Sequence, residues 1–161
     1  MSEVRTGIGW DSHRLVAGRP LILGGVRLEH EFGLEGHSDA DVLTHAVMDA
    51  VLGAAGLDDI GAHFPDTDRD FKDADSIELL GRVAQLVTDA GYEVVNVDAT
   101  ILMERPKVGA RRAEMRERLA GALGLARDRV NVKATTGEGI GFVGRGEGVG
   151  ALAVATLRGG A

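Results

Sequence analysis

Val95-Asn96-Val97-Asp98-Ala99-Thr100 and Val130-Asn131-Val132-Lys133-Ala134-Thr135 share one pattern, 35 positions apart, and this pattern decides the fold that we predict. Apolar and polar residues alternate in the first copy, as in a strand with one buried face. A predicted helix precedes each copy, because apolar residues recur there at helical spacing. The first helix begins at its cap, Ser76, and ends at Gly91, and the second covers residues 110–123 and ends at Gly124. We therefore predict neighbouring helix–strand units in a mixed β-sheet with helices on one face, an α/β (α+β, ferredoxin-like) fold.

The remaining elements surround these two units. Short apolar stretches predict strands over residues 4–8, 21–28 and 150–157. Apolar residues recur at helical spacing over residues 39–57, where Ser38 is the expected N-cap, with Asp41 three residues further on. The connection at 58–75 is long and rich in acids, and loops of this length are usually functional or disordered. A Gly-rich turn at 137–150 leads into the last strand.

Composition and charge exclude several classes of protein. The 161 residues include no Cys, which excludes thiol nucleophiles, thiolate zinc sites and disulfides. With 18 basic against 25 acidic side chains, the net charge is −7, and the chain lacks the basic stripe that nucleic-acid binding needs. No apolar run approaches the ~20 residues of a membrane span. We therefore expect one domain over residues 1–161, located in the cytoplasm, that acts on a small molecule.

Asp11, His13 and His45 are the candidate metal ligands. Asp11 and His13 follow the first predicted strand and project to the same side if the extended backbone continues, although a surface turn explains an isolated Asp-x-His pair equally well. His45 has Asp41 and Asp49 one helical turn away on either side, but an isolated helical histidine is more often a satisfied surface or core residue. Two imidazoles and one carboxylate together would make a zinc-type set with an open fourth position, as in catalytic sites.

Two segments have features of phosphate sites. His37 and Ser38 lie at the predicted helix N-terminus, where free N–H groups favour anions, although a simple capping role for Ser38 explains the same residues. Residues 135–148 combine Thr hydroxyls, backbone amides and Glu138 in one turn, which fits a phosphate cradle and a tight hairpin equally well. This turn is neither a Walker loop nor a dinucleotide fingerprint, because no Gly-Lys-Ser/Thr follows and because it leads into a strand. The Arg-rich residues 105–118 alternate with Glu, which indicates a solvated helix face.

Several of these segments together resemble a known family. They occur in order along essentially the whole chain: Gly9-Trp10-Asp11-Ser12-His13, Gly36-His37-Ser38-Asp39-Ala40-Asp41-Val42, Asp59-Ile60-Gly61, Phe64-Pro65-Asp66-Thr67-Asp68, Pro106-Lys107, and Lys133-Ala134-Thr135-Thr136 with the turn to Gly148. They are similar to the motifs of the 2-C-methyl-D-erythritol 2,4-cyclodiphosphate synthases, which serve the non-mevalonate route to isoprenoids. The resemblance implies a homotrimer of α/β subunits with active sites at the subunit interfaces.

The resemblance also implies roles for individual residues. It implies Zn²⁺ on Asp11, His13 and His45, and Mg²⁺ or Mn²⁺ on Glu138 and the substrate phosphates. It implies that His37 and Thr136 are catalytic, stabilising the transition state, and that Ser38 binds phosphate with them. The other implied substrate contacts are Ser12; Asp59, Ile60 and Gly61 at the ribose; Phe64, Pro65, Asp66, Thr67 and Asp68 at the methylerythritol; Met103, Pro106, Lys107, Val108, Gly109, Ala134 and Thr135 around the cytidine; Gly137; and Phe142 and Arg145 towards the trimer axis.

The reaction that the resemblance implies needs no protein nucleophile. An oxygen of the substrate's 2-phosphate attacks the β-phosphorus of its diphosphate and expels CMP, so that catalysis consists of positioning and charge neutralisation. This would make the protein a phosphorus–oxygen lyase. A metal-dependent phosphohydrolase and a trimeric nucleotide or metal sensor are the alternatives that share these features. Three residues depart from the family pattern: Trp10 in place of Phe or Tyr, Gly137 in place of Thr or Asn, and Gly139 where some members have Lys.

Overall fold

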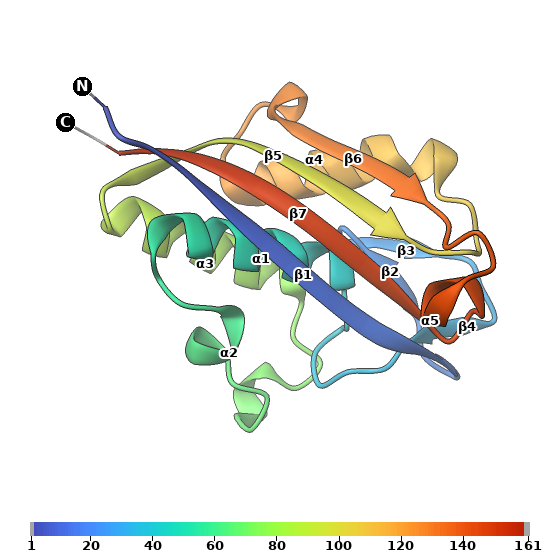
Figure 1. The fold of residues 1–161 in the computed structure, drawn as a ribbon. Helices are drawn as coiled ribbons and strands as arrows, with labels where there is room; N and C mark the ends of the chain where they lie inside the picture. Colours follow the sequence, from blue (N-terminus) through green and yellow to red (C-terminus); the bar gives the residue numbers. More distant parts are fainter. Residues whose placement is uncertain (1, 160–161) are drawn as a thin grey trace.

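Five strands form one mixed sheet in the computed structural model, which describes residues 2–159 (Figure 1). In spatial order they are β4 (Phe32–Leu34), β1 (Val4–Ala17), β7 (Gly148–Gly159), β5 (Tyr92–Leu102) and β6 (Val130–Thr135). β5 and β6 run parallel, whereas the other neighbouring pairs are antiparallel. β2 (Leu21–Leu23) and β3 (Val26–Leu28) form a separate hairpin.

Three long helices cover one face of this sheet. They are α1 (Val42–Ala55), α3 (Ser76–Asp89) and α4 (Arg112–Leu123), and all three lie behind the strands in Figure 1. Two one-turn helices, α2 (Ile60–His63) and α5 (Gly141–Gly144), and three short 3₁₀ turns, Arg69–Phe71, Gly109–Arg111 and Arg127–Arg129, complete the fold. The mixed sheet with its helices on one face is the predicted fold class, and the structure confirms it.

The repeated pattern in the sequence marks the two parallel neighbours of the sheet. β5 and β6 lie side by side, and Val97 is paired with Val130. Alternate residues of both strands are buried against the helices, among them Val97, Ala99, Ile101 and Val132. The prediction of two neighbouring helix–strand units is therefore correct.

Several predicted boundaries are wrong. β1 continues to Ala17 instead of ending at Ile8, so that Asp11, Ser12 and His13 lie inside the strand. The stretch 21–28 forms two strands with a turn at Gly24 and Gly25 between them. The turn at 137–150 contains helix α5, and β7 begins at Gly148 instead of Gly150.

Both predicted N-caps also differ from the structure. Asp41, and not Ser38, caps α1, and Asp75, and not Ser76, caps α3. The Asp41 carboxylate accepts hydrogen bonds from the amide of Thr44 at 3.0 Å and from the amides of Gly24 and Gly25 at 2.8 and 2.7 Å. A contact with a distant hairpin therefore selects this cap, and local sequence does not reveal it. His37 and Ser38 consequently lie in a loop ahead of the helix and not at its N-terminus.

The outer face of the sheet, turned away from the three helices, carries large apolar side chains. Ile8 and Trp10 on β1 are 68% and 50% exposed, and their partners Val154 and Leu152 on β7 are also exposed. Exposed apolar patches of this kind are typical of interaction surfaces. Within residues 2–159, no helix is long and apolar enough to span a membrane.

Candidate active site

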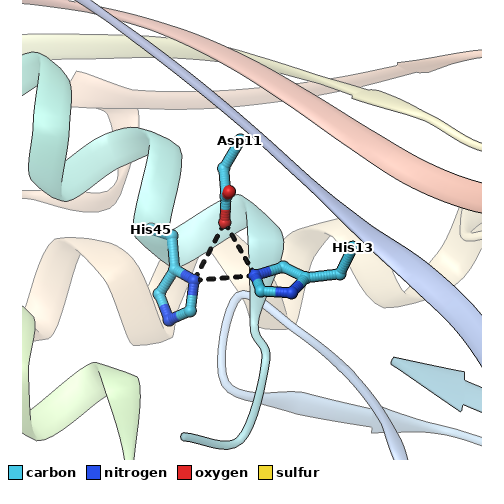
Figure 2. A group of neighbouring side chains, drawn as sticks. All are labelled: Asp11, His13 and His45. Atoms are coloured by element: carbon cyan, nitrogen blue, oxygen red, sulfur yellow. Dashed lines mark hydrogen bonds and ion pairs between the residues drawn. The ribbon is translucent and has the colours of Figure 1, made fainter. Parts of the chain in front are cut away.

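Asp11, His13 and His45 point towards one another from β1 and α1 (Figure 2). Asp11 Oδ2 lies 2.9 Å from His13 Nε2 and 2.9 Å from His45 Nδ1. The two ring nitrogens are 3.2 Å apart. The structure thus brings together the three side chains that the sequence analysis assigned to one metal site.

Two glycines of β1 allow α1 to approach closely enough for this arrangement. A Cβ at Gly9 would lie 1.8 Å from the carbonyl oxygen of Ala46, and one at Gly7 would lie 2.2 Å from that of Ala50. No larger residue fits at either position without moving the helix. Because His45 directly precedes Ala46, this close contact sets how near the His45 ring lies to Asp11.

The donor set fits a zinc-type ion. One carboxylate oxygen and two imidazole nitrogens are ligands that Zn²⁺ accepts, and the distances between them are close to the edge of about 3.3 Å expected for tetrahedral ligands about 2.0 Å from the metal. Three protein ligands leave one position free, which is the usual arrangement in catalytic zinc sites. The three residues could therefore hold a metal with room for one substrate atom.

The electrostatics of the group favour a bound cation. Burial favours the neutral acid at Asp11, but in the metal-free protein hydrogen bonds from the rings of His13 and His45, with both of their nitrogens protonated, outweigh it and lower the pKa of Asp11 to about 2. Burial likewise lowers the pKa of His13, but the hydrogen bond and the charge of Asp11 together raise it above its ordinary value. The ionised carboxylate therefore draws positive charge into the site, either as a proton on His13 or as a metal ion.

A cavity of about 440 Å³ opens beside these three residues. Its other lining residues come from the segments before and after α1 and from α1 and α3 themselves: Gly36, His37, Ser38, Met48, Ile60, Gly61, Phe64, Pro65, Asp66, Phe71 and Leu79. The rings of Phe64 and Phe71 meet edge to face with their centroids 5.3 Å apart. The cavity thus has polar groups at the Asp11 end and an aromatic wall.

Hydrogen bonds fix the loop that carries His37 and Ser38. His37 Nε2 donates to the carbonyl of Asp68 at 3.0 Å. The guanidinium of Arg19 donates to the carbonyl of Ser38 at 3.0 Å and to that of Leu34 at 2.9 Å. The loop therefore has a defined shape beside the cavity, even though it is not the start of a helix.

Asp41 and Asp49, the acids one helical turn from His45, do not join it in the site. Asp41 is fully buried and faces the β2–β3 hairpin. Asp49 accepts a hydrogen bond from the amide of Ile60 at 2.9 Å, and burial raises its pKa. Asp49 therefore fixes the start of α2, where Ile60 and Gly61 line the cavity.

The other predicted site residues lie elsewhere in the chain. A separate cavity of about 90 Å³ gathers most of those expected around the cytidine, namely Met103, Pro106, Lys107, Val108, Ala134, Thr135 and also Thr136. Ser12 and Phe142 line a third cavity of about 200 Å³, and Ser12 is exposed on the face of β1 opposite to Asp11. Seven predicted residues line none of these three cavities: Asp59, Thr67, Asp68, Gly109, Gly137, Glu138 and Arg145.

The Gly-rich turn folds back tightly on itself. The amide of Glu138 donates to Thr136 Oγ1 at 3.2 Å, and the amide of Gly137 donates to the carboxylate of Glu104. A Cβ at Gly137 would lie 2.7 Å from the backbone nitrogen of Gly144, so glycine suits this path of the backbone. Glu138 is exposed at the tip of the turn and does not reach the cavity beside Asp11 in this chain.

Asp39 and Ser76 are polar residues next to the site that sequence reasoning did not assign to it. Ser76 Oγ lies 3.0 Å from His45 Nε2, and Asp39 Oδ1 lies 2.5 Å from Ser76 Oγ. Both residues occur at predicted helix starts, where capping alone explains them, and 37 positions separate them. No local signal could have shown that they meet at His45.

Comparison with known proteins gives consistent matches over nearly the full length. Residues 4–158 match the model of the YgbB family. A 2-C-methyl-D-erythritol 2,4-cyclodiphosphate synthase of Salinibacter ruber is 63% identical over 155 residues, covering 96% of this chain and 99% of that protein.

Solved structures with the same fold are also similar in sequence. The bifunctional IspDF of Campylobacter jejuni matches with a TM-score of 0.95 and 44% identity, over 99% of this chain and 43% of that longer chain. The IspF–CDP complex from Plasmodium falciparum matches with a TM-score of 0.85 and 27% identity, over 98% of this chain and 97% of that one.

Proposed function

Since this chain belongs to the YgbB family, we propose that it converts 4-diphosphocytidyl-2-C-methyl-D-erythritol 2-phosphate into 2-C-methyl-D-erythritol 2,4-cyclodiphosphate and CMP. It would act as a phosphorus–oxygen lyase of the non-mevalonate route to isoprenoids. The observation that carries the proposal is the convergence of Asp11, His13 and His45 beside a cavity of about 440 Å³. A cytoplasmic location and one synthase domain over residues 1–161 belong to the same proposal, although residues 1, 160 and 161 lie outside the described part of the chain.

The three ligands would hold Zn²⁺ through Asp11 Oδ2, His13 Nε2 and His45 Nδ1. Bound there, the metal would neutralise phosphate charge through its free fourth position. His37 and Ser38, on the fixed loop beside the cavity, would bind and orient the phosphates. The wall formed by Phe64, Pro65 and Asp66 would enclose the methylerythritol, and Ile60 and Gly61 would meet the ribose.

The chemistry needs positioning and no protein nucleophile. An oxygen of the 2-phosphate forms a bond to the β-phosphorus, the bond from that phosphorus to the bridging oxygen breaks, and CMP leaves with this oxygen. Both phosphates belong to one substrate molecule, so the reaction is already intramolecular, and the site contributes by holding the attacking oxygen and the β-phosphorus in one orientation. His37 and Thr136 would stabilise the charge that develops, and Glu138 would hold Mg²⁺ or Mn²⁺ on the diphosphate.

A homotrimer would complete the site. Thr136 and the residues expected around the cytidine line a different cavity from Asp11, and Glu138 lies at an exposed tip. The exposed apolar outer face of β1 and β7 supports self-association. In the trimer, we expect the cytidine pocket of one subunit and the metal group of another to share one substrate, with Phe142 and Arg145 towards the axis.

Product analysis tests this function. The protein is incubated with the diphosphocytidyl substrate, Zn²⁺ and Mg²⁺, and the products are identified by phosphorus NMR and mass spectrometry. We expect CMP and the cyclic diphosphate in equal amounts. Release of inorganic phosphate or of an open-chain product would indicate a phosphohydrolase, and binding of CDP without turnover would indicate a sensor. Either result would contradict the proposal.

A further inference from the structure

We propose that Asp39 and Ser76 are positioning residues of the metal site, which hold the ring of His45 with its proton on Nε2 and so leave Nδ1 free to bind the metal. This inference rests on the metal site of the proposed function. It concerns two residues that the site prediction did not include, and it follows from the hydrogen bonds on the outward side of His45.

The ring of His45 has an inward and an outward nitrogen. Nδ1 faces Asp11 and His13 at 2.9 and 3.2 Å, whereas Nε2 faces Ser76 Oγ at 3.0 Å. A neutral imidazole carries one proton, so the partner of Nε2 decides whether Nδ1 has a lone pair for a metal. The contact with Ser76 therefore decides which nitrogen can act as a ligand.

Asp39 determines the direction of that contact. Its Oδ1 accepts from Ser76 Oγ at 2.5 Å and from the amide of Asp41 at 3.1 Å, and its Oδ2 accepts from the amide of Ser76 at 2.9 Å. Ser76 has a single hydroxyl proton, and it is donated in the hydrogen bond to Asp39. Towards His45 the Ser76 oxygen can only accept, so Nε2 must carry the proton.

The second hydroxyl near Nε2 agrees with this assignment. Ser38 Oγ lies 3.2 Å from Nε2 and accepts a hydrogen bond from the amide of Ala40 at 3.3 Å. It can accept from Nε2 as well. The same logic applies to His13, whose Nδ1 donates to the carbonyl of Glu35 at 2.8 Å and leaves Nε2 for the metal.

The two histidines differ in what fixes them. A backbone carbonyl orients His13, and no substitution removes it, whereas side chains orient His45. Ser76 is fully buried and His45 is 7% exposed, so water does not readily replace a lost partner. Hydrogen bonds of this kind to the outer nitrogen of a metal-binding histidine are usually worth 10- to 100-fold in metal affinity.

Asp39→Asn is the decisive variant. Asparagine has one acceptor oxygen where aspartate has two, so it loses the hydrogen bond either from the hydroxyl or from the amide of Ser76. With its NH₂ group towards the hydroxyl, it makes Ser76 donate to His45. The ring proton then moves to Nδ1, on the side of the metal. Ser76→Ala is the second variant, which removes the acceptor, and it decides the question alone if Asp39→Asn does not fold.

Asp75→Asn is the matched control. Asp75 is the N-cap of the same helix, α3, and accepts from the amide of Ile77 at 2.9 Å, but it lies outside the chain of bonds that ends at His45. A loss of zinc affinity caused only by a weakened start of α3 would appear in this variant as well.

Two measurements follow on the full-length protein: the zinc dissociation constant, by competition with a chromogenic chelator, and proton NMR of the His45 ring N–H in zinc-saturated protein. We expect zinc binding to weaken about 10- to 100-fold in Asp39→Asn and Ser76→Ala, and less than threefold in Asp75→Asn. The ring proton should exchange slowly in the unmodified protein and in Asp75→Asn, and rapidly in Ser76→Ala.

Unchanged zinc affinity in both variants, or equal weakening in Asp75→Asn, would overturn the positioning role while leaving the metal site in place. A fast-exchanging His45 ring proton in the unmodified protein would overturn it too. If the unmodified protein binds no zinc at all, the proposed function fails first and this inference fails with it.

Discussion

Gly9 of β1 lies directly against Ala46 of α1, because a Cβ at Gly9 would be 1.8 Å from the carbonyl oxygen of Ala46. The strand that carries Asp11 and the helix that carries His45 thus touch backbone to backbone, one residue from His45. We infer that the geometry of the metal group depends on the absence of a side chain at Gly9.

We predict that Gly9→Ala pushes α1 away from β1 and weakens zinc binding. Overpacking of this kind costs about 1–3 kcal/mol, which urea denaturation of the metal-free protein would show as a lower free energy of unfolding. Gly53→Ala is the control, because a Cβ at this position of α1 meets nothing closer than the carbonyl of Ile8 at 3.9 Å. It should stabilise the protein by about 0.5–1 kcal/mol and leave zinc affinity unchanged. Similar effects of the two substitutions would contradict the interpretation.

We predict that Arg19→Met loosens the loop that carries His37 and Ser38. The substitution removes the hydrogen bonds to the carbonyls of Leu34 and Ser38, each of which a charged group donates, and we expect the unfolding free energy to fall by about 1–3 kcal/mol. Hydrogen exchange should accelerate at the amide of Asp73, which donates to the carbonyl of His37. Arg27→Met, at an exposed position of β3, is the control. Exchange rates that stay the same in Arg19→Met would refute the role of Arg19.

The three candidate metal ligands could be predicted from sequence as one group, and the structure brings them together. The strand that carries two of them could not be delimited. Alternation along β1 is the reverse of the usual pattern, since Gly9, Asp11 and His13 face the helices and Ile8 and Trp10 face outwards. A search for buried apolar residues therefore ends the strand at Ile8. The sequence signal that the strand continues is the presence of glycines instead of large side chains on its inner face, but only the contact with α1 explains these glycines.

The helix caps and the surroundings of His45 show a second limit of prediction from the sequence. Asp, Ser and Asn all cap helices, and the choice of Asp41 over Ser38 depends on amides in a hairpin 16 and 17 positions earlier. Likewise, Asp39 and Ser76 acquire their place beside His45 only when α1 and α3 pack together. Local patterns identify which residues can cap or ligate, and tertiary contacts decide which of them do.

We predict that Ile8→Lys disperses the proposed trimer into monomers. Ile8 pairs with Val154 on the uncovered face of the sheet, and a buried unpaired charge at a subunit interface is costly. Sedimentation velocity would show the change in mass, and activity should fall with it because the proposed site needs more than one subunit. Gln85→Lys adds the same charge on the exposed side of α3 and should leave mass and activity unchanged. A trimer that survives Ile8→Lys would argue against an interface on this face.

We predict that Glu138→Gln lowers turnover at least 10-fold at limiting Mg²⁺ while zinc content stays the same, because the substitution removes charge where the second cation would bind. Steady-state kinetics over a range of Mg²⁺ concentrations measure the effect on the second cation. Mass spectrometry measures the zinc content, so the effects on the two metals are distinguished. Glu78→Gln, at an exposed position in the first turn of α3, serves as the control. Unchanged kinetics in Glu138→Gln at limiting Mg²⁺ would remove Glu138 from the mechanism.

We predict a pH window for the contribution of Asp11 to the stability of the metal-free protein. The pKa of Asp11 is lowered from 3.8 to about 2 in the fold, mainly because hydrogen bonds from two imidazoles outweigh burial, so ionised Asp11 stabilises the fold above pH 3.8 and this contribution is lost as pH falls towards 2. The pKa of His13 is raised from 6.5, so protonated His13 stabilises the fold below pH 6.5 and this contribution is lost as pH rises through the raised pKa.

The difference in unfolding free energy between the unmodified protein and Asp11→Asn should therefore be largest between the two ordinary pKa values, 3.8 and 6.5. We expect about 1–2 kcal/mol there, after allowing for the partial exposure of both side chains, and a smaller difference on either side. Urea denaturation in the presence of a chelator, repeated from acid to neutral pH, measures it. Asp128→Asn, at an exposed turn, should give a small difference throughout. If the Asp11→Asn difference is the same at every pH, then the carboxylate and the imidazole are not coupled as their geometry requires, and the case for a preformed cation site loses its electrostatic support.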